Sequence, residues 1–105
     1  MISVLIASYN INVVNLVEEL HLQLNKANVI FEIICLDDAS NSEKNIENNK
    51  INKLPFCHFE ILKKNIGRSA IRNLLATKAS YDWLFFLDAE VLPTSPKFIS
   101  NYLKE

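Results

Sequence analysis

Glycine is almost absent from this chain, because Gly67 is the only one among 105 residues. Loops that wrap a phosphate group in backbone N–H donors, such as the Walker loop and the dinucleotide-binding fingerprint, need several closely spaced glycines. Neither loop can form here. A phosphate bound by this chain would have to be held by a metal ion, by cationic side chains or by the N-terminus of a helix.

Cysteine and histidine are scarce as well. Cys35 and Cys57 lie in apolar stretches, without CxxC spacing and without a neighbouring group of histidines. We expect both to be buried, reduced thiols, and we expect no zinc site. His21 and His58 have no ligand or triad partner at a recognisable spacing, so neither receives a role.

The chain has neither a long apolar run near its start nor a surplus of charge of one sign. Its first apolar stretch, residues 4–7, is too short for a transmembrane helix or a signal peptide. Eleven basic against twelve acidic residues give a net charge of −1, which argues against nucleic-acid binding. We expect one globular domain over residues 1–105, located in the cytoplasm, with membrane association of a longer protein left open.

The apolar pattern predicts alternating strands and helices. Strands are expected at residues 2–7, 29–36, 56–62 and 81–87, and helices at 13–24, 68–78 and 97–104. The polar stretch 41–53 could be a surface helix or a loop. Alternation of this kind indicates an α/β fold with a mostly parallel open sheet, strand order 3-2-1-4, and helices on both faces.

The fourth predicted strand ends in two carboxylates. Its apolar run has no polar alternation, which predicts a strand buried on both faces. Asp88 and Glu90 follow at its carboxyl end, the edge at which open α/β sheets bind ligands. Carboxylate oxygens suit Mg²⁺ or Mn²⁺. A solvated loop with two acids is the alternative for an isolated D-x-E motif.

Two further polar groups are expected near the same edge. Asp37 and Asp38 follow the second strand, where they could accept hydrogen bonds from a base or a ribose, or where one of them could form an Asx-turn. Arg68 and Arg72 lie near the start of a helix and could meet phosphate oxygens. Solvated side chains or salt bridges are the alternative for either arginine.

Four blocks of the sequence resemble the family 2 glycosyltransferases of the GT-A fold, in the order and spacing of that family. They are SVLIASYN at 3–10, LDDAS at 36–40, NIG at 65–67 with RN at 72–73, and FLDAE at 86–90. The resemblance implies a UDP- or GDP-linked sugar donor, a Mg²⁺ or Mn²⁺ ion, and a sugar or lipid-linked acceptor.

The resemblance also implies roles for individual residues. On the nucleoside side, Ala7 and Tyr9 would line the pocket, and Asp38 would contact the base with Asp37 beside it. Arg68 lies in the segment that would face the nucleotide.

On the metal side, the resemblance implies that Asp88 approaches the ribose and that Glu90, together with Asp88, holds the cation. The family motif usually ends in Asp, and Glu90 is one methylene longer. Because Mg²⁺ requires tight geometry, that methylene would shift the ion or weaken its binding.

The chain is also much shorter than is usual in that family. We expect it to be the donor-binding half, without the acceptor site and the catalytic base, so no catalytic residue is assigned. Alone it should bind the donor weakly and transfer little or no sugar.

Two other functions are compatible with the pattern. A receiver-like signalling module would use Asp37 or Asp38 as the phosphoacceptor, but it also needs a lysine at a fifth strand end, which is lacking. A non-catalytic interaction domain is the second alternative. An uncovered sheet edge would allow such a chain to form a homo-oligomer.

Overall fold

The structure is a computed structural model that describes residues 1–89. Its strands are β1 (Ile2–Ser8), β2 (Phe31–Asp37), β3 (Cys57–Ile61) and β4 (Trp83–Asp88), and its helices are α1 (Val14–Lys26), α2 (Lys44–Asn48), the 3₁₀ helix η1 (Asn49–Lys53) and α3 (Arg68–Lys78). Of the stretch 41–53, which the sequence left undecided, residues 44–53 are therefore helical.

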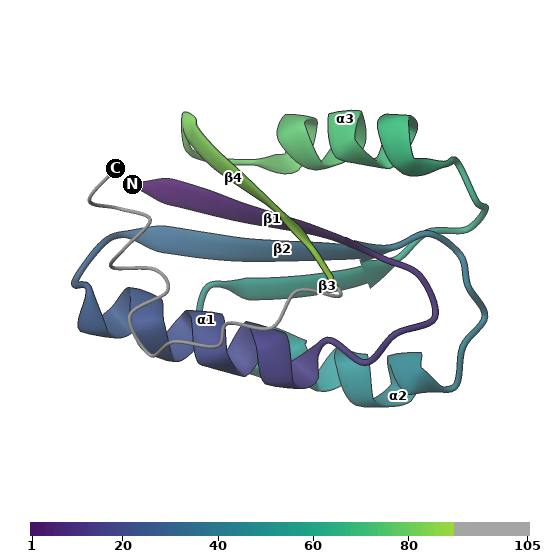
Figure 1. The fold of residues 1–105 in the computed structure, drawn as a ribbon, viewed down its shortest axis with the longest axis horizontal. Coiled ribbons are helices and arrows are strands. Elements are labelled where there is room, and N and C mark those ends of the chain that lie inside the picture. Colours follow the sequence, from purple (N-terminus) through teal and green to yellow (C-terminus); the bar gives the residue numbers. More distant parts are fainter. Residues whose placement is uncertain (90–105) are drawn as a thin grey trace.

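The four strands form one parallel sheet with the order β3-β2-β1-β4, as predicted. Helix α3 lies over one face of the sheet, whereas α1 and α2 lie on the opposite side (Figure 1). The chain runs outward from β1 to β3 and then returns to the other side of β1 for β4. The switch point, where the strand order reverses, therefore lies between β1 and β4.

Alternate residues of the central strands fill two cores. Ile2, Val4 and Ile6 of β1 point to the α1 side, where they pack with Leu20 and Leu24. On the other face, a smaller core lies beneath α3 and includes Leu5, Ile34, Leu36, Ile71 and Leu75. The period of two along each strand thus places one set of apolar side chains under each layer of helices.

The prediction that the fourth strand is buried on both faces was wrong for the residues described. Trp83 is 48% exposed, and the next four residues of β4 are only partly buried. The reason is position: in residues 1–89, β4 has β1 as its one strand neighbour, and α3 packs mainly over β1 and β2. An apolar sequence indicates that a strand favours burial, but the elements packed against the strand determine how much of its surface is buried.

The predicted helix at 97–104 lies outside the described residues, and so does Glu90. Within residues 1–89, none of the helices combines the length and the apolar character needed to cross a membrane.

A buried carboxylate joins three separate parts of the chain at the amino end of the sheet. Glu32 of β2 is only 8% exposed, and its Oε2 accepts hydrogen bonds from Ser3 Oγ of β1 at 2.6 Å and from Ser80 N at 2.5 Å. Ser3 Oγ in turn accepts one from Tyr81 N at 3.2 Å. This network fixes the connection between α3 and β4 to the end of the sheet.

The outer edge of β3 is partly occupied by a side chain. Phe59 N donates to Asn52 Oδ1 at 2.8 Å, and Asn52 Nδ2 donates to Phe59 O at 3.1 Å. The amide of Asn52, from η1, therefore bonds to Phe59 as an adjacent strand would. Next to it, Cys57 N donates to the carbonyl of Leu54. These bonds leave fewer backbone groups on β3 for pairing with another chain.

Replacing Asn52 with alanine should increase self-association, because it exposes the N–H and C=O groups of Phe59 at a sheet edge. We expect light scattering after gel filtration to give a larger mean mass for Asn52→Ala than for the wild type at the same concentration. Asn49→Ala, an exposed change in the same 3₁₀ helix, is the matched control and should behave as the wild type. Equal masses for all three proteins would contradict this role for Asn52.

Candidate functional site

A pocket of about 300 Å³ lies at the carboxyl ends of β1 and β4, at the switch point of the sheet. Strand register explains its position, because Ala7 pairs with Asp88 across β1 and β4, and Ser8 pairs with Asp37 across β1 and β2. The pocket is lined by Ala7, Ser8, Tyr9, Ile11, Asp38, Asn65, Gly67, Arg68, Ile71, Asp88 and Ala89.

Five of the seven residues to which the family resemblance assigns a role line this one pocket: Ala7, Tyr9, Asp38, Arg68 and Asp88. They come from four segments that are far apart in the sequence. Asp37 is not among the lining residues, and Glu90 lies outside the described part of the chain. The sheet thus brings most of the predicted site together.

A second hollow, of about 240 Å³, adjoins the first and shares Ala7, Arg68 and Asp88 with it. It extends between α3 and β4, where the guanidinium carbon of Arg72 lies 4.6 Å from the ring centroid of Phe86. Arg68 and Arg72 are one helical turn apart, so two cations face the same groove. The two hollows form one cleft along the switch point.

The two neighbouring aspartates have different surroundings. Asp37 is fully buried, and its two oxygens accept hydrogen bonds from Ser40 N at 2.9 Å and from Ser40 Oγ at 2.8 Å. The bond to the Ser40 N–H is a local side-chain-to-backbone turn of the kind considered for one of the pair, although it reaches three residues on, whereas an Asx-turn reaches two. A direct contact of Asp37 with a nucleotide stays a prediction, and the partner that the structure describes is Ser40.

Asp38 reaches across to the loop before α3. Its Oδ1 accepts a hydrogen bond from Ile66 N at 2.8 Å, and its Oδ2 accepts one from Gly67 N at 3.0 Å. Its backbone carbonyl accepts a third from Asn65 Nδ2 at 3.0 Å. Asp38 as a residue is 8% exposed and lies on the wall of the pocket.

Tyr9 is the large aromatic side chain of the pocket and is 59% exposed. It follows β1 directly, and Asn10 after it adopts a left-handed conformation with φ of 55°, which turns the chain out of the strand. Lys44 Nζ donates a hydrogen bond to the carbonyl of Asn10 at 3.2 Å. These features fix the backbone next to Tyr9, and its exposed ring contributes to the lining of the pocket.

The donor chemistry of the pocket fits a hard divalent cation. Among residues 1–89 its lining includes carboxylates but neither His nor Cys, which suits Mg²⁺ or Mn²⁺ better than zinc. Asp88 is exposed at the end of β4 and contributes to both hollows. In the same range there is no group of three His, Cys, Asp or Glu side chains that could hold a metal alone. A cation bound here would share its shell with phosphate oxygens and water.

The two thiols take no part in this chemistry. Cys35 and Cys57 are free and buried, as predicted. Burial raises the pKa of each thiol from 9.0 to about 12, and for Cys35 a hydrogen bond to Ser8 Oγ opposes the rise. Both remain neutral at physiological pH and are poor nucleophiles and metal ligands.

The profile of glycosyl transferase family 2 matches residues 3–101 of the chain. The chain belongs to this family. A comparison with curated protein sequences gave no match. Membership agrees with the four sequence blocks described above and argues against the receiver-like alternative.

Solved structures show the same fold for this family 2 domain. It is similar to S. aureus TarS residues 1–349, with a TM-score of 0.73 and 22% identity, over 98% of this chain and 31% of that chain. The same protein in complex with UDP-GlcNAc gives a TM-score of 0.68 at 23% identity, over 98% and 30%. The mannosyltransferase PcManGT from Pyrobaculum calidifontis, in complex with GDP-Man and Mn²⁺, gives 0.74 at 17%, over 98% and 31%. The chain therefore spans about a third of the length of each of these solved chains.

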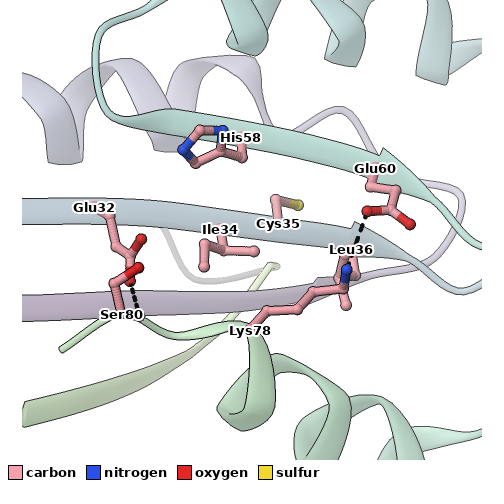
Figure 2. A pocket seen from close by; sticks show the side chains of 8 residues that line it. All are labelled: Glu32, Ile34, Cys35, Leu36, His58, Glu60, Lys78 and Ser80. Atoms are coloured by element: carbon pink, nitrogen blue, oxygen red, sulfur yellow. Dashed lines mark hydrogen bonds and ion pairs between the residues drawn. The ribbon is translucent and has the colours of Figure 1, made fainter. Parts of the chain in front are cut away.

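A further pocket of the family 2 domain, of about 340 Å³, lies over β2 and β3 beside the end of α3 (Figure 2). Glu32 and Ser80 are hydrogen-bonded at one end, and Glu60 and Lys78 form an ion pair with an N–O distance of 3.3 Å at the other. None of the residues predicted from the sequence lines it. Its polar groups are largely engaged with one another.

Asn65 and Gly67 line the main pocket although neither was given a site role from the sequence. The signal for them was present, since both belong to the NIG block of the family resemblance. Their contact with Asp38 joins positions 27 to 29 residues apart, and local sequence patterns carry no information on such a pairing.

Proposed function

We propose that this family 2 domain binds a nucleotide-diphosphate sugar together with Mg²⁺ or Mn²⁺, and that the longer enzyme transfers the sugar to an acceptor hydroxyl. The observation that carries the proposal is the gathering of Ala7, Tyr9, Asp38, Arg68 and Asp88 around one pocket at the switch point. This is the position at which open α/β sheets bind ligands. The solved relatives with UDP-GlcNAc, or with GDP-Man and Mn²⁺, support the choice of ligand class.

The pocket divides into a nucleoside side and a phosphate side. Ala7 leaves space next to the strand end, and the exposed ring of Tyr9 offers an apolar surface for the nucleoside. Asp38 forms the wall of the pocket on the nucleoside side. On the other side, Arg68 at the start of α3 would bind diphosphate oxygens, helped by the positive end of the helix dipole.

Asp88 would contact the ribose and, with Glu90, hold the cation. When bound, the cation would neutralise negative charge on the diphosphate leaving group. The acceptor oxygen would form the new bond at the anomeric carbon while the bond to the diphosphate breaks, with inversion. Arg68 would stabilise the departing diphosphate through charge-assisted hydrogen bonds. We assign the base that takes the hydroxyl proton to none of the residues 1–105.

Calorimetric titration of the 105-residue chain with UDP and with GDP, each in Mn²⁺ and in EDTA, tests this proposal. We expect one nucleotide to bind about tenfold more tightly with Mn²⁺ than without it. Incubation with the matching nucleotide sugar should give little or no transfer. Binding of neither nucleotide would contradict a donor site in this chain. Sugar transfer at the rate of a complete enzyme would contradict the assignment of the catalytic base to none of the residues 1–105.

A further inference from the structure

Asp38 is the point at which three loops around the pocket are joined. Its N–H donates to the carbonyl of Ser8 at the end of β1, at 2.9 Å. Its carboxylate accepts the N–H groups of Ile66 and Gly67, and its carbonyl accepts the side chain of Asn65. Asp38 therefore links the exits of β1 and β2 to the loop that leads into α3.

The conformation of that loop needs an external support. Gly67 has φ of 87° and ψ of 164°, a region that residues with a Cβ rarely adopt. A Cβ at Gly67 would meet no atom within 4 Å, so the backbone conformation, and not a lack of space, favours glycine here. The two hydrogen bonds to Asp38 are the described contacts that fix its backbone N–H and that of Ile66.

The direction of α3 depends on the same point. The first backbone hydrogen bond of the helix runs from Ile71 N to the carbonyl of Gly67 at 3.0 Å, and Arg68 is the first helical residue. A shift of residues 65–67 would therefore move Arg68 relative to Asp88 on the opposite wall. The negative charge of Asp38 also lies at the positive end of this helix, where it is favourable.

We propose that Asp38 is a positioning residue, which holds residues 65–67 in place so that Arg68 faces the donor. This inference rests on the proposed function for the donor itself. Asp38 is 8% exposed as a residue, and its carboxylate accepts a backbone N–H on each oxygen, so the carboxylate is oriented toward the protein. Its removal should therefore weaken nucleotide binding through Arg68 and the start of α3, more than through a lost contact to the base.

Amide hydrogen exchange, measured by NMR without any nucleotide, tests the loop contact alone. In the wild type, the amides of Ile66 and Gly67 should be protected, and Asp38→Ala should raise their exchange rates about tenfold or more. Asp38→Asn, which keeps one acceptor and is the milder change, should expose one of the two amides. Asp82→Ala, an exposed change before β4, should leave both protected. Unchanged protection in Asp38→Ala would overturn the inference.

A double-mutant cycle with Arg68 tests how Asp38 acts on binding. In the wild-type background, Asp38→Ala should weaken UDP or GDP binding about tenfold, whereas in Arg68→Ala it should cause little further loss. Gly67→Ala should reproduce the loss although Asp38 is intact, because φ of 87° strains any residue with a Cβ. Equal losses from Asp38→Ala in both backgrounds would indicate a direct base contact and overturn the inference. If the wild type binds neither nucleotide, the proposed function fails, while amide exchange still decides whether Asp38 holds the loop.

Discussion

Replacing Asp88 with alanine should abolish the metal-dependent part of nucleotide binding. Asp88 lies next to Ala7 at the end of β4 and lines both hollows of the cleft, so its carboxylate is placed between the nucleoside and phosphate sides. We expect the affinity of Asp88→Ala in Mn²⁺ to fall about tenfold, to the value of the wild type in EDTA. Calorimetric titration with the nucleotide that the wild type prefers measures this directly.

Two variants make the result interpretable. Asp88→Asn keeps the shape of the side chain but removes its charge, and it should lose as much affinity as the alanine variant if the carboxylate meets the cation. Asp82→Ala removes an exposed acid just before the same strand, at the opposite end of the sheet, and should bind as the wild type does. A variant at position 88 that still responds to Mn²⁺ would contradict the role of Asp88.

The second large effect is expected at Glu32, far from the cleft, and concerns stability. Glu32→Ala removes the acceptor for Ser3 Oγ and Ser80 N and leaves the Ser3 hydroxyl without it in a buried place, whereas Ser80 is an exposed residue. Losing hydrogen bonds to a buried charged group costs about 3 kcal/mol, a large part of the 5–15 kcal/mol that is typical of a domain. The thermal midpoint should fall by roughly 14 °C.

The controls for this effect also lie on β2 and β3. Glu32→Gln keeps an oxygen acceptor and should cost only about 1 kcal/mol. Glu60→Ala removes an exposed partner of Lys78 and should change the free energy of unfolding by less than about 0.5 kcal/mol. Urea unfolding of the 105-residue chain gives all three values. An alanine variant at position 32 as stable as the wild type would show that the Ser3 and Ser80 contacts contribute nothing net.

Helix α3 shows which parts of the fold were predictable from the sequence. Its predicted bounds, 68–78, agree with the structure because Gly67 stops the preceding segment and Ile71 and Leu75 recur one turn apart. The order 3-2-1-4 was also predictable, since handedness and connection rules leave few arrangements for alternating strands and helices. How far the helices cover each strand was not predictable in this way, because the exposure of Trp83 depends on where α1 and α3 lie across the sheet.

The two aspartates show the same division within the site. The turn at Asp37 involves Ser40 three residues later, so a local rule could anticipate it. The partners of Asp38 are 28 and 29 residues away and come together only when the strand ends align. The sequence thus indicated which carboxylates reach the site but not that the protein itself occupies the oxygens of Asp38.

The strand order has a consequence for synthesis on the ribosome. Strand β1 is synthesised first but becomes an inner strand of the sheet, between β2 and β4. About 75 residues separate the end of β1 from the start of β4. At 5–20 residues per second, translation of that stretch takes on the order of 4 to 15 s. Throughout this interval the edge of β1 that later pairs with β4 has no partner strand, so the nascent chain offers chaperones and other nascent chains a row of unpaired backbone N–H and C=O groups that the finished sheet conceals.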